Sequence, residues 1–206
     1  NEMAAARTEK RITTVMYDPS LPVDTDWDLG IGDATAIWFS QSLKSGEVRL
    51  IDYAEGSGEG FPYYSRILSA KPYAYGKHWA PHDIQVRELS SGRSRLEVAK
   101  SHGISFSVCP RLARSVAGEV EEGIHAVRMF LPRCWFDGAR CAKGIEHLMH
   151  YRRDYNLKLR EFKATPVHDK ASHAADAFRG LAVRHKIPRD AASAQRMEMS
   201  AGWTWC

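Results

Sequence analysis

Several features that would assign this chain to a common class of protein are missing from its sequence. No run of apolar residues approaches the roughly 20 that a membrane-spanning helix needs, so we expect no membrane span and no membrane partner. The four cysteines include no Cys-x-x-Cys pair, which argues against a zinc site and indicates a reduced, cytosolic setting. No charged-then-apolar leader opens the chain, so we expect no secretory signal.

Motifs of several enzyme classes are missing as well. The sequence contains no G-x-x-x-x-G-K-[ST] phosphate loop, so we expect no ATP hydrolysis by this chain. It contains no G-x-S-x-G nucleophile elbow, and its glycine-rich stretch at residues 56–60 lacks the G-x-G-x-x-G frame of a dinucleotide site. Residue 1 is Asn rather than Met, from which we expect a fragment of a longer protein.

The residues that are present suit a folded domain, but their charges are unevenly distributed. With 206 residues, 44% of them hydrophobic, the chain is long enough to bury a core of its own. Residues 1–60 carry 5 Lys or Arg and 11 Asp or Glu, whereas residues 61–150 carry 13 and 8, and residues 151–190 carry 10 and 5. An acidic first third followed by basic segments suits a metal-dependent enzyme that acts on a phosphate polyanion. Charge alone favours the simpler interpretation, in which like charges cluster by chance on solvated faces.

The pattern of apolar residues and turn signals predicts an α/β fold, with a mixed sheet of about five strands or more flanked by helices. Short links join the first three strands into an expected antiparallel meander over residues 22–29, 34–42 and 47–55. The later segments are expected as helices over 61–70, 94–102, 115–131, 139–155 and 170–185, and as strands over 75–80, 104–110 and 157–164. We expect a linker remnant over residues 1–20, one domain over 21–186 and a flexible tail over 187–206.

Aspartates alternate along the first predicted strand. Because successive side chains of a strand point to opposite faces, Asp24, Asp26 and Asp28 share one face and the apolar side chains share the other. Like charges on one face repel unless water or cations neutralise them. Asp24 and Asp26 suit a wet edge. Asp28 ends the strand and precedes Gly30 and Gly32, which would let a phosphate approach, so it is either a metal ligand or a turn residue.

Two further aspartates are candidates for chemistry. Asp83 follows a predicted strand, and the carboxyl ends of strands are where α/β sheets present ligands, although Asp also often caps a turn. Asp176 lies on the last predicted helix, on a face with small neighbours that leave room for a metal. It is alternatively half of a surface ion pair with the Arg three residues on. The residues on its face are Ser172, His173, Arg179 and Gly180.

Two histidines on the predicted helix 139–155 have metal-ligand spacing. His147 and His150 are separated by three residues. No carboxylate or thiol partner for them is evident in the sequence, so we interpret both as half-exposed helix residues.

Three sequence fragments, taken together and in order, resemble one family. They are WDLGIGDATAIWFSQ (27–41), PHDIQVREL (81–89) and HDKASHAADAFRGLA (168–182). Over about residues 20–186 the chain resembles the nuclease domain of the large terminase subunit of tailed bacteriophages. The resemblance implies a ribonuclease-H-like fold and an endonuclease that cuts concatemeric double-stranded viral DNA during genome packaging. The three acidic residues of the family signature carry over to Asp28, Asp83 and Asp176, and further metal contacts are open to Asp24, Asp26 and Asp33.

This resemblance also implies a chemistry. Carboxylate oxygens select Mg²⁺ or Mn²⁺ rather than Zn²⁺, and two such ions would activate a water and stabilise the leaving oxygen. Asp28 would bridge the two ions, and Asp83 and Asp176 would each hold one. His173, one turn before Asp176, would orient a ligand or shuttle a proton. Lys and Arg contacts to phosphates carry no sequence information, so weak sequence preference is expected.

The partners and the rival interpretations follow from the same resemblance. The implied partners are double-stranded DNA, the motor ATPase domain of the same protein, the small terminase subunit and the capsid portal, all in the host cytoplasm. One rival is another ribonuclease-H-like enzyme, such as a junction resolvase or a transposase. The other is a non-enzymatic docking module that binds the motor or the portal.

Overall fold

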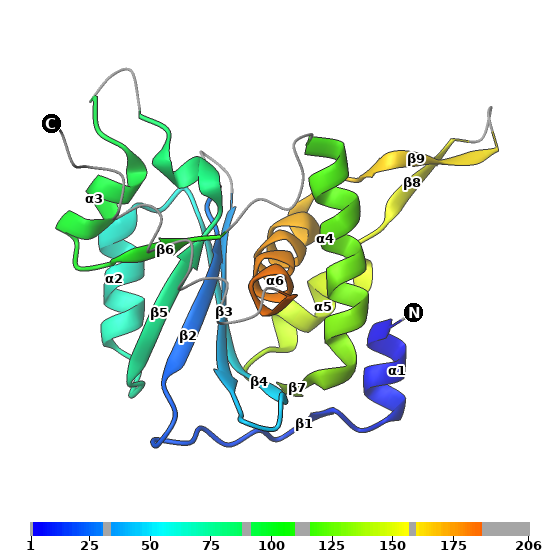
Figure 1. Ribbon diagram of the computed structural model, residues 1–206, viewed down its shortest axis with the longest axis horizontal. Helices are drawn as coiled ribbons and strands as arrows, with labels where there is room; N and C mark the ends of the chain where they lie inside the picture. The colour runs from blue at the N-terminus through cyan, green and yellow to red at the C-terminus, as the bar shows by residue number, and fades with distance from the viewer. Residues whose placement is uncertain (1, 31–33, 88–91, 110–115, 157–159, 187–206) are drawn as a thin grey trace, which may run out of the picture.

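One mixed sheet organises the molecule (Figure 1). The computed structural model describes residues 2–30, 34–87, 92–109, 116–156 and 160–186. In the main sheet of this part of the chain the strand order is β1-β7-β4-β3-β2-β5-β6, and β3 alone runs antiparallel to its neighbours. The strands are β1 (Ile12–Thr13), β2 (Val23–Asp28), β3 (Ala34–Ser42), β4 (Val48–Ser57), β5 (Tyr75–Ala80), β6 (Phe106–Val108) and β7 (Cys134–Asp137). The predicted α/β fold with a mixed sheet is confirmed.

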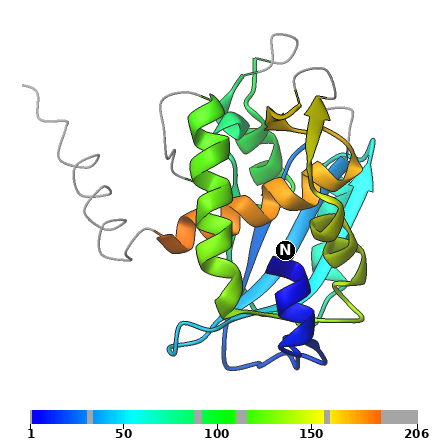
Figure 2. The same cartoon turned by 90° about the vertical axis from the view of Figure 1, so that its right-hand side faces the viewer.

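Helices cover both faces of this sheet and enclose two separate hydrophobic cores (Figures 1 and 2). On one face lie α1 (Glu2–Thr8), α4 (Val116–Phe130), α5 (Ala142–His150) and α6 (Lys170–Lys186), around a first core that includes Trp38, Phe136 and Phe178. On the other face lie α2 (Phe61–Ser69) and α3 (Arg95–Ser101), around a second core that includes Trp27, Phe39 and Ile84. The sheet therefore has no open face over its central strands.

Strand β2 separates the two cores as the alternation in its sequence predicts. Val23 and Trp27 are buried in the second core. Asp26 and Asp28, on the opposite side of the strand, contact side chains of α6. The acidic face of β2 is therefore covered by a helix rather than by water.

The structure divides the predicted helix over 139–155 into a helix and a strand. α5 ends at His150 because Tyr151 is extended, with φ −63° and ψ 122°. The chain then forms β8 (Arg153–Asn156), which pairs antiparallel with β9 (Glu161–Pro166) in a second, two-stranded sheet. This hairpin projects away from the main sheet in Figure 1. The sequence pattern also did not predict β7, the short strand that connects β1 to β4.

Part of the segment expected as a linker, residues 1–20, is folded against the domain. Strand β1 pairs with β7, and the buried guanidinium of Arg11 donates hydrogen bonds to the carbonyls of Leu131 and Cys134 at 2.8 and 2.9 Å. The expected tail over 187–206 lies outside the described residues. Within the described ranges, no helix is long and apolar enough to cross a membrane.

Candidate active site

The three aspartates that the resemblance assigns to the family signature line one cavity of about 330 Å³, which Asp26 lines as well. β2 ends at Asp28, and β5 ends at Ala80, shortly before the 3₁₀ turn η1 (His82–Gln85) that carries Asp83. Since β2 and β5 are parallel neighbours, their carboxyl ends open at the same edge of the sheet. α6 passes over this edge and brings Asp176 to the cavity.

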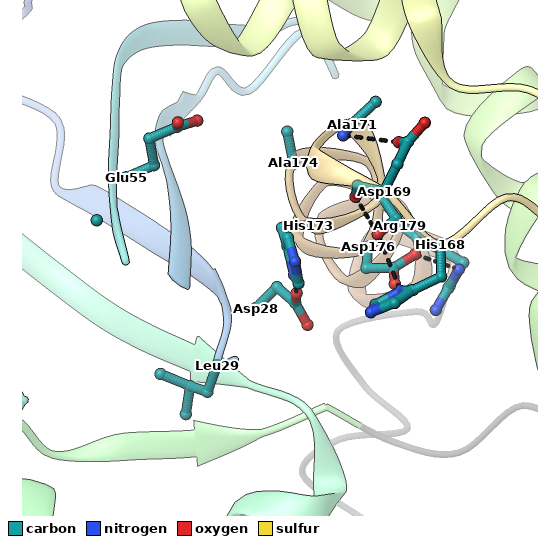
Figure 3. Close-up of polar contacts among 12 residues, drawn as sticks. Asp28, Leu29, Glu55, His168, Asp169, Ala171, His173, Ala174, Asp176 and Arg179 are labelled. Carbon is teal, nitrogen blue, oxygen red and sulfur yellow. Dashed lines mark hydrogen bonds and ion pairs between the residues drawn. The ribbon is translucent and has the colours of Figure 1, made fainter. Parts of the chain in front are cut away.

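Asp28 is held from one side by a histidine of α6. The Nδ1 atom of His173 lies 2.9 Å from Oδ2 of Asp28 (Figure 3). The His173 side chain is 6% exposed, whereas the Asp28 side chain is 22% exposed and reaches the cavity. His173, which we expect to orient a ligand or shuttle a proton, thus contacts Asp28 directly.

Asp176 forms the ion pair that the alternative interpretation of its sequence expects, and it also lines the cavity. The guanidinium of Arg179 donates a hydrogen bond of 2.6 Å to Oδ1 of Asp176. Burial raises the pKa of Asp176, the charge of Asp28 adds to this effect, and the charge of Arg179 offsets part of it. Gly123 of α4 leaves room for the arginine, because a Cβ atom at that position would lie 2.3 Å from Cδ of Arg179.

Asp83 is the exposed member of the three. Its neighbour Ile84 is fully buried in the second core and anchors the turn. Pro81 fixes the entry to this turn with φ −64°. The Asp83 side chain is thereby placed at the rim of the cavity with its carboxylate in solvent.

The other acidic residues of the first motif have different surroundings. Arg184 of α6 donates two hydrogen bonds to the Asp26 carboxylate, at 2.7 and 2.9 Å, and the two side chains are only 8% and 1% exposed. Asp24 accepts a hydrogen bond of 2.8 Å from the backbone N–H of Lys77 and lies 3.4 Å from Arg184. Asp26 is thus neither on a wet edge nor free to take a metal. Asp33 lies outside the described residues.

Comparisons with known proteins agree on the fold. The nuclease domain of the P22 large terminase superposes with a TM-score of 0.61 at 18% identity, over 86% of this chain and 89% of that one. The nuclease domain of the large terminase g2p from phage SPP1, with bound Mn, gives 0.59 at 16% identity, over 81% and 87%. The fold is that of a large terminase nuclease domain. No protein-family model and no curated protein sequence matches the chain.

A longer structure with this terminase fold shows how much of a large terminase the chain represents. A large terminase from a thermophilic bacteriophage superposes with a TM-score of 0.60 at 15% identity, over 85% of this chain. The superposition covers only 42% of that longer protein. The chain therefore spans about two fifths of the length of the thermophilic phage terminase.

The donor set of this terminase-like site suits Mg²⁺ or Mn²⁺. As the described residues stand, no group of three or more His, Cys, Asp and Glu side chains is arranged to hold a metal ion. Asp28 and Asp176 are turned instead toward His173 and Arg179. However, four carboxylates line one cavity, those of Asp28, Asp83 and Asp176 come from three separate elements, and the charge of Asp28 adds to burial in raising the pKa of Asp176. A cation between them would relieve this repulsion, so the residues fit a divalent ion.

A second polar cluster on the same face escaped the sequence analysis. His147 is paired with a carboxylate after all, since its Nε2 lies 2.9 Å from Oε2 of Glu55. The two residues are 92 positions apart, so no local spacing could reveal the contact. The one sequence feature that could have indicated this cluster is the expected antiparallel meander. In its observed register, Asp28 of β2 and Glu55 of β4 are both opposite the same residue of β3, Ala36.

Proposed function

We propose that this chain is a divalent-metal-dependent endonuclease that cuts double-stranded, concatemeric viral DNA during genome packaging. The observation that carries the proposal is the meeting of Asp28, Asp83 and Asp176 at one cavity, from three elements of a terminase nuclease fold. Among the structures of this fold, the SPP1 domain was solved with bound Mn.

The three aspartates would hold two Mg²⁺ or Mn²⁺ ions. When bound, the ions supply Lewis-acid activation of a water and neutralisation of the leaving oxygen in phosphodiester hydrolysis. Asp28 at the end of β2 would hold an ion together with Asp83 of η1 and Asp176 of α6, which line the same cavity.

His173 and Arg179 would act on the carboxylates. His173 is almost fully buried and fixes the orientation of Asp28 through its Nδ1 atom. Its hydrogen-bonding position also allows it to hold a proton beside the carboxylate. In the absence of a metal ion, the charge of Arg179 would neutralise that of Asp176. The repulsion between Asp176 and Asp28 would then cost the folded state less.

The substrate and partners follow from the same proposal. Lys and Arg side chains around the cavity would contact phosphates, so that sequence preference is weak. The motor ATPase domain, the small terminase subunit and the capsid portal would be its partners in the host cytoplasm. The motor would lie outside these residues, since the chain spans about two fifths of the thermophilic phage terminase.

Plasmid nicking tests this function directly. The chain should nick and linearise supercoiled plasmid with Mg²⁺ or Mn²⁺ and be inactive with EDTA. Asp176→Asn should be inactive under both conditions, and Lys44→Ala, at the opposite end of the β3–β4 hairpin, should match the unmodified chain. Cleavage that persists in EDTA, or in the Asp176→Asn variant, would contradict the proposal.

A further inference from the structure

Glu55, Lys143 and His147 form a polar cluster on the face of the sheet that carries Asp28. The Glu55 carboxylate receives Nζ of Lys143 at 2.6 Å on one oxygen, and on the other it receives Nε2 of His147 at 2.9 Å and the hydroxyl of Tyr53 at 2.6 Å. The Glu55 side chain is 19% exposed and the Lys143 side chain is 63% exposed. A largely buried carboxylate thus holds a lysine whose ammonium group faces solvent.

The close approach of α5 to the sheet depends on a missing side chain. Gly144 lies between Lys143 and His147 in sequence, and a Cβ atom there would lie 2.5 Å from the Trp38 ring and 2.7 Å from the Tyr53 ring. Glycine inside a helix weakens that helix. At this position it lets α5 lie directly on β3 and β4, which brings Lys143 and His147 to Glu55.

Strand pairing places this cluster beside the candidate active site. Asp28 is opposite Ala36 in the β2–β3 pair, and Ala36 is opposite Glu55 in the β3–β4 pair. Residues directly opposite in such pairs share a face, so Asp28 and Glu55 stand in one row, separated by two strand spacings of about 4.8 Å each. In Figure 3, Glu55 and Asp28 both lie to one side of α6. The charges of Glu55 and Asp28 both add to burial in raising the pKa of Tyr53.

We propose that Lys143, positioned by Glu55 and His147, binds a second phosphate of the DNA strand whose scissile phosphate lies at Asp28. The proposal rests on the proposed nuclease function. Because a DNA strand winds around the helix axis, its successive phosphates are further apart than the 3.4 Å rise per base pair, and the row's separation of about 10 Å corresponds to about one or two nucleotides of one strand. A phosphate one or two nucleotides from the cut would therefore fall within reach of the ammonium group.

The cluster of Glu55, Lys143 and His147 is better suited to binding a phosphate than to stabilising the fold. An ion pair with a solvent-exposed lysine contributes little to folding. Burial alone would raise the pKa of Glu55, but the hydrogen bonds from Lys143 and Tyr53 and the charge of His147 lower it overall, so the carboxylate remains charged. Glu55 therefore holds the ammonium group in place. A lysine held in this way loses less conformational freedom when it binds a phosphate.

Salt-dependent DNA binding in EDTA tests the subsite without any cleavage. The affinity of a short labelled duplex is measured over a salt series for the unmodified chain, Lys143→Ala, Lys143→Arg and Lys44→Ala. Losing one phosphate contact should reduce the slope of log K against log salt by about one in Lys143→Ala. Lys143→Arg should keep the slope. Lys44→Ala removes the same charge from an exposed site at the far end of the β3–β4 hairpin and should also keep it.

The outcomes separate this proposal from the nuclease function. Equal slopes for Lys143→Ala and Lys44→Ala would overturn the subsite even if the unmodified chain cuts plasmid. A reduced slope in Lys143→Ala alone supports the subsite, and a failure to cut plasmid would then overturn the nuclease function only. No measurable binding by the unmodified chain would overturn the subsite, while plasmid cutting with Mn²⁺ still decides the nuclease function. Because Lys143 is exposed, the Lys143→Ala variant should melt at the same temperature as the unmodified chain.

Discussion

Asp26 and Asp28 stand two residues apart on the same face of β2 and line the same cavity, yet they differ in exposure and in the partner of the carboxylate. Asp26 is 1% exposed and shares two hydrogen bonds with a buried guanidinium. Asp28 is 22% exposed, faces a cavity and has a histidine as its partner. The first carboxylate is satisfied entirely within the fold. The second keeps an open side toward a second carboxylate, which is the arrangement that binds a cation.

The largest expected effect is the loss of cleavage when the cavity carboxylates are neutralised. Asp28→Asn, Asp83→Asn and Asp176→Asn should each reduce the rate of plasmid nicking with Mn²⁺ by on the order of a thousandfold or more, since groups that act as a unit each carry most of the rate. Their melting temperatures should stay the same or rise, because a repelling charge is removed. Rates within tenfold of the unmodified chain in all three variants would show that the assignment of these ligands is wrong.

The second effect concerns the buried pair. Arg184→Met leaves the Asp26 carboxylate buried without its cation and should lower the free energy of unfolding by about 3–5 kcal/mol. Urea denaturation measures this change. The double variant Asp26→Leu/Arg184→Met removes both charges and should recover most of the loss. If Arg184→Met is as stable as the unmodified chain, the pair does not stabilise α6 on β2.

A smaller effect is expected from the histidine that orients Asp28. His173→Ala removes a partner of a candidate metal ligand, and such changes cost about 10- to 100-fold in metal affinity or activity. Mn²⁺ titration followed by the rate of nicking measures both quantities. His150→Ala is the matched control, because His150 is an exposed histidine of α5 whose ring contacts a local carbonyl. Equal Mn²⁺ affinity in the two variants would show that His173 does not contribute to metal binding.

The smallest effect sharpens the comparison within β2. A metal at roughly ten times its Kd stabilises the folded state by about 1.4 kcal/mol, which corresponds to a rise in melting temperature on the order of 3–6 °C for a domain of this size. Asp28→Asn should remove most of this rise, while Asp24→Asn should keep it, since Asp24 is occupied by Lys77 and Arg184. Melting curves with and without Mn²⁺ for both variants make the test. Identical rises in melting temperature for the two variants would show that Asp28 is an ordinary turn residue. That result would favour a non-enzymatic docking module.

Sequence reasoning succeeded where the signal was local or where several motifs agreed. The alternation along β2 predicted which side chains share a face, and three ordered fragments predicted the terminase nuclease fold. The partner of Asp26 could not be predicted, because Arg184 lies 158 residues away and only the packing of α6 brings it there. Without that partner, Asp26 resembled a residue of a wet edge.

The missed strands have a different explanation. β7 contains four residues and follows the 3₁₀ turn η2 (Leu131–Arg133), so its apolar pattern merges with the end of the preceding helix. β8 was assigned to a helix because its sequence continues that of α5 without a glycine or proline between them. Both strands are short and are stabilised by pairing with other segments. Local sequence propensity therefore does not predict them.

The division of the molecule into two cores has a consequence for how the protein is made. Asp83 is anchored through Ile84 in one core, Asp176 lies on a helix whose Phe178 and Leu181 belong to the other, and Asp28 lies on the strand between them. The candidate site therefore requires both halves to be folded. During synthesis, the ribosome must release α6 before the last of the three carboxylates can reach the cavity. If the proposed function is right, a growing chain cannot cut DNA until the domain is complete.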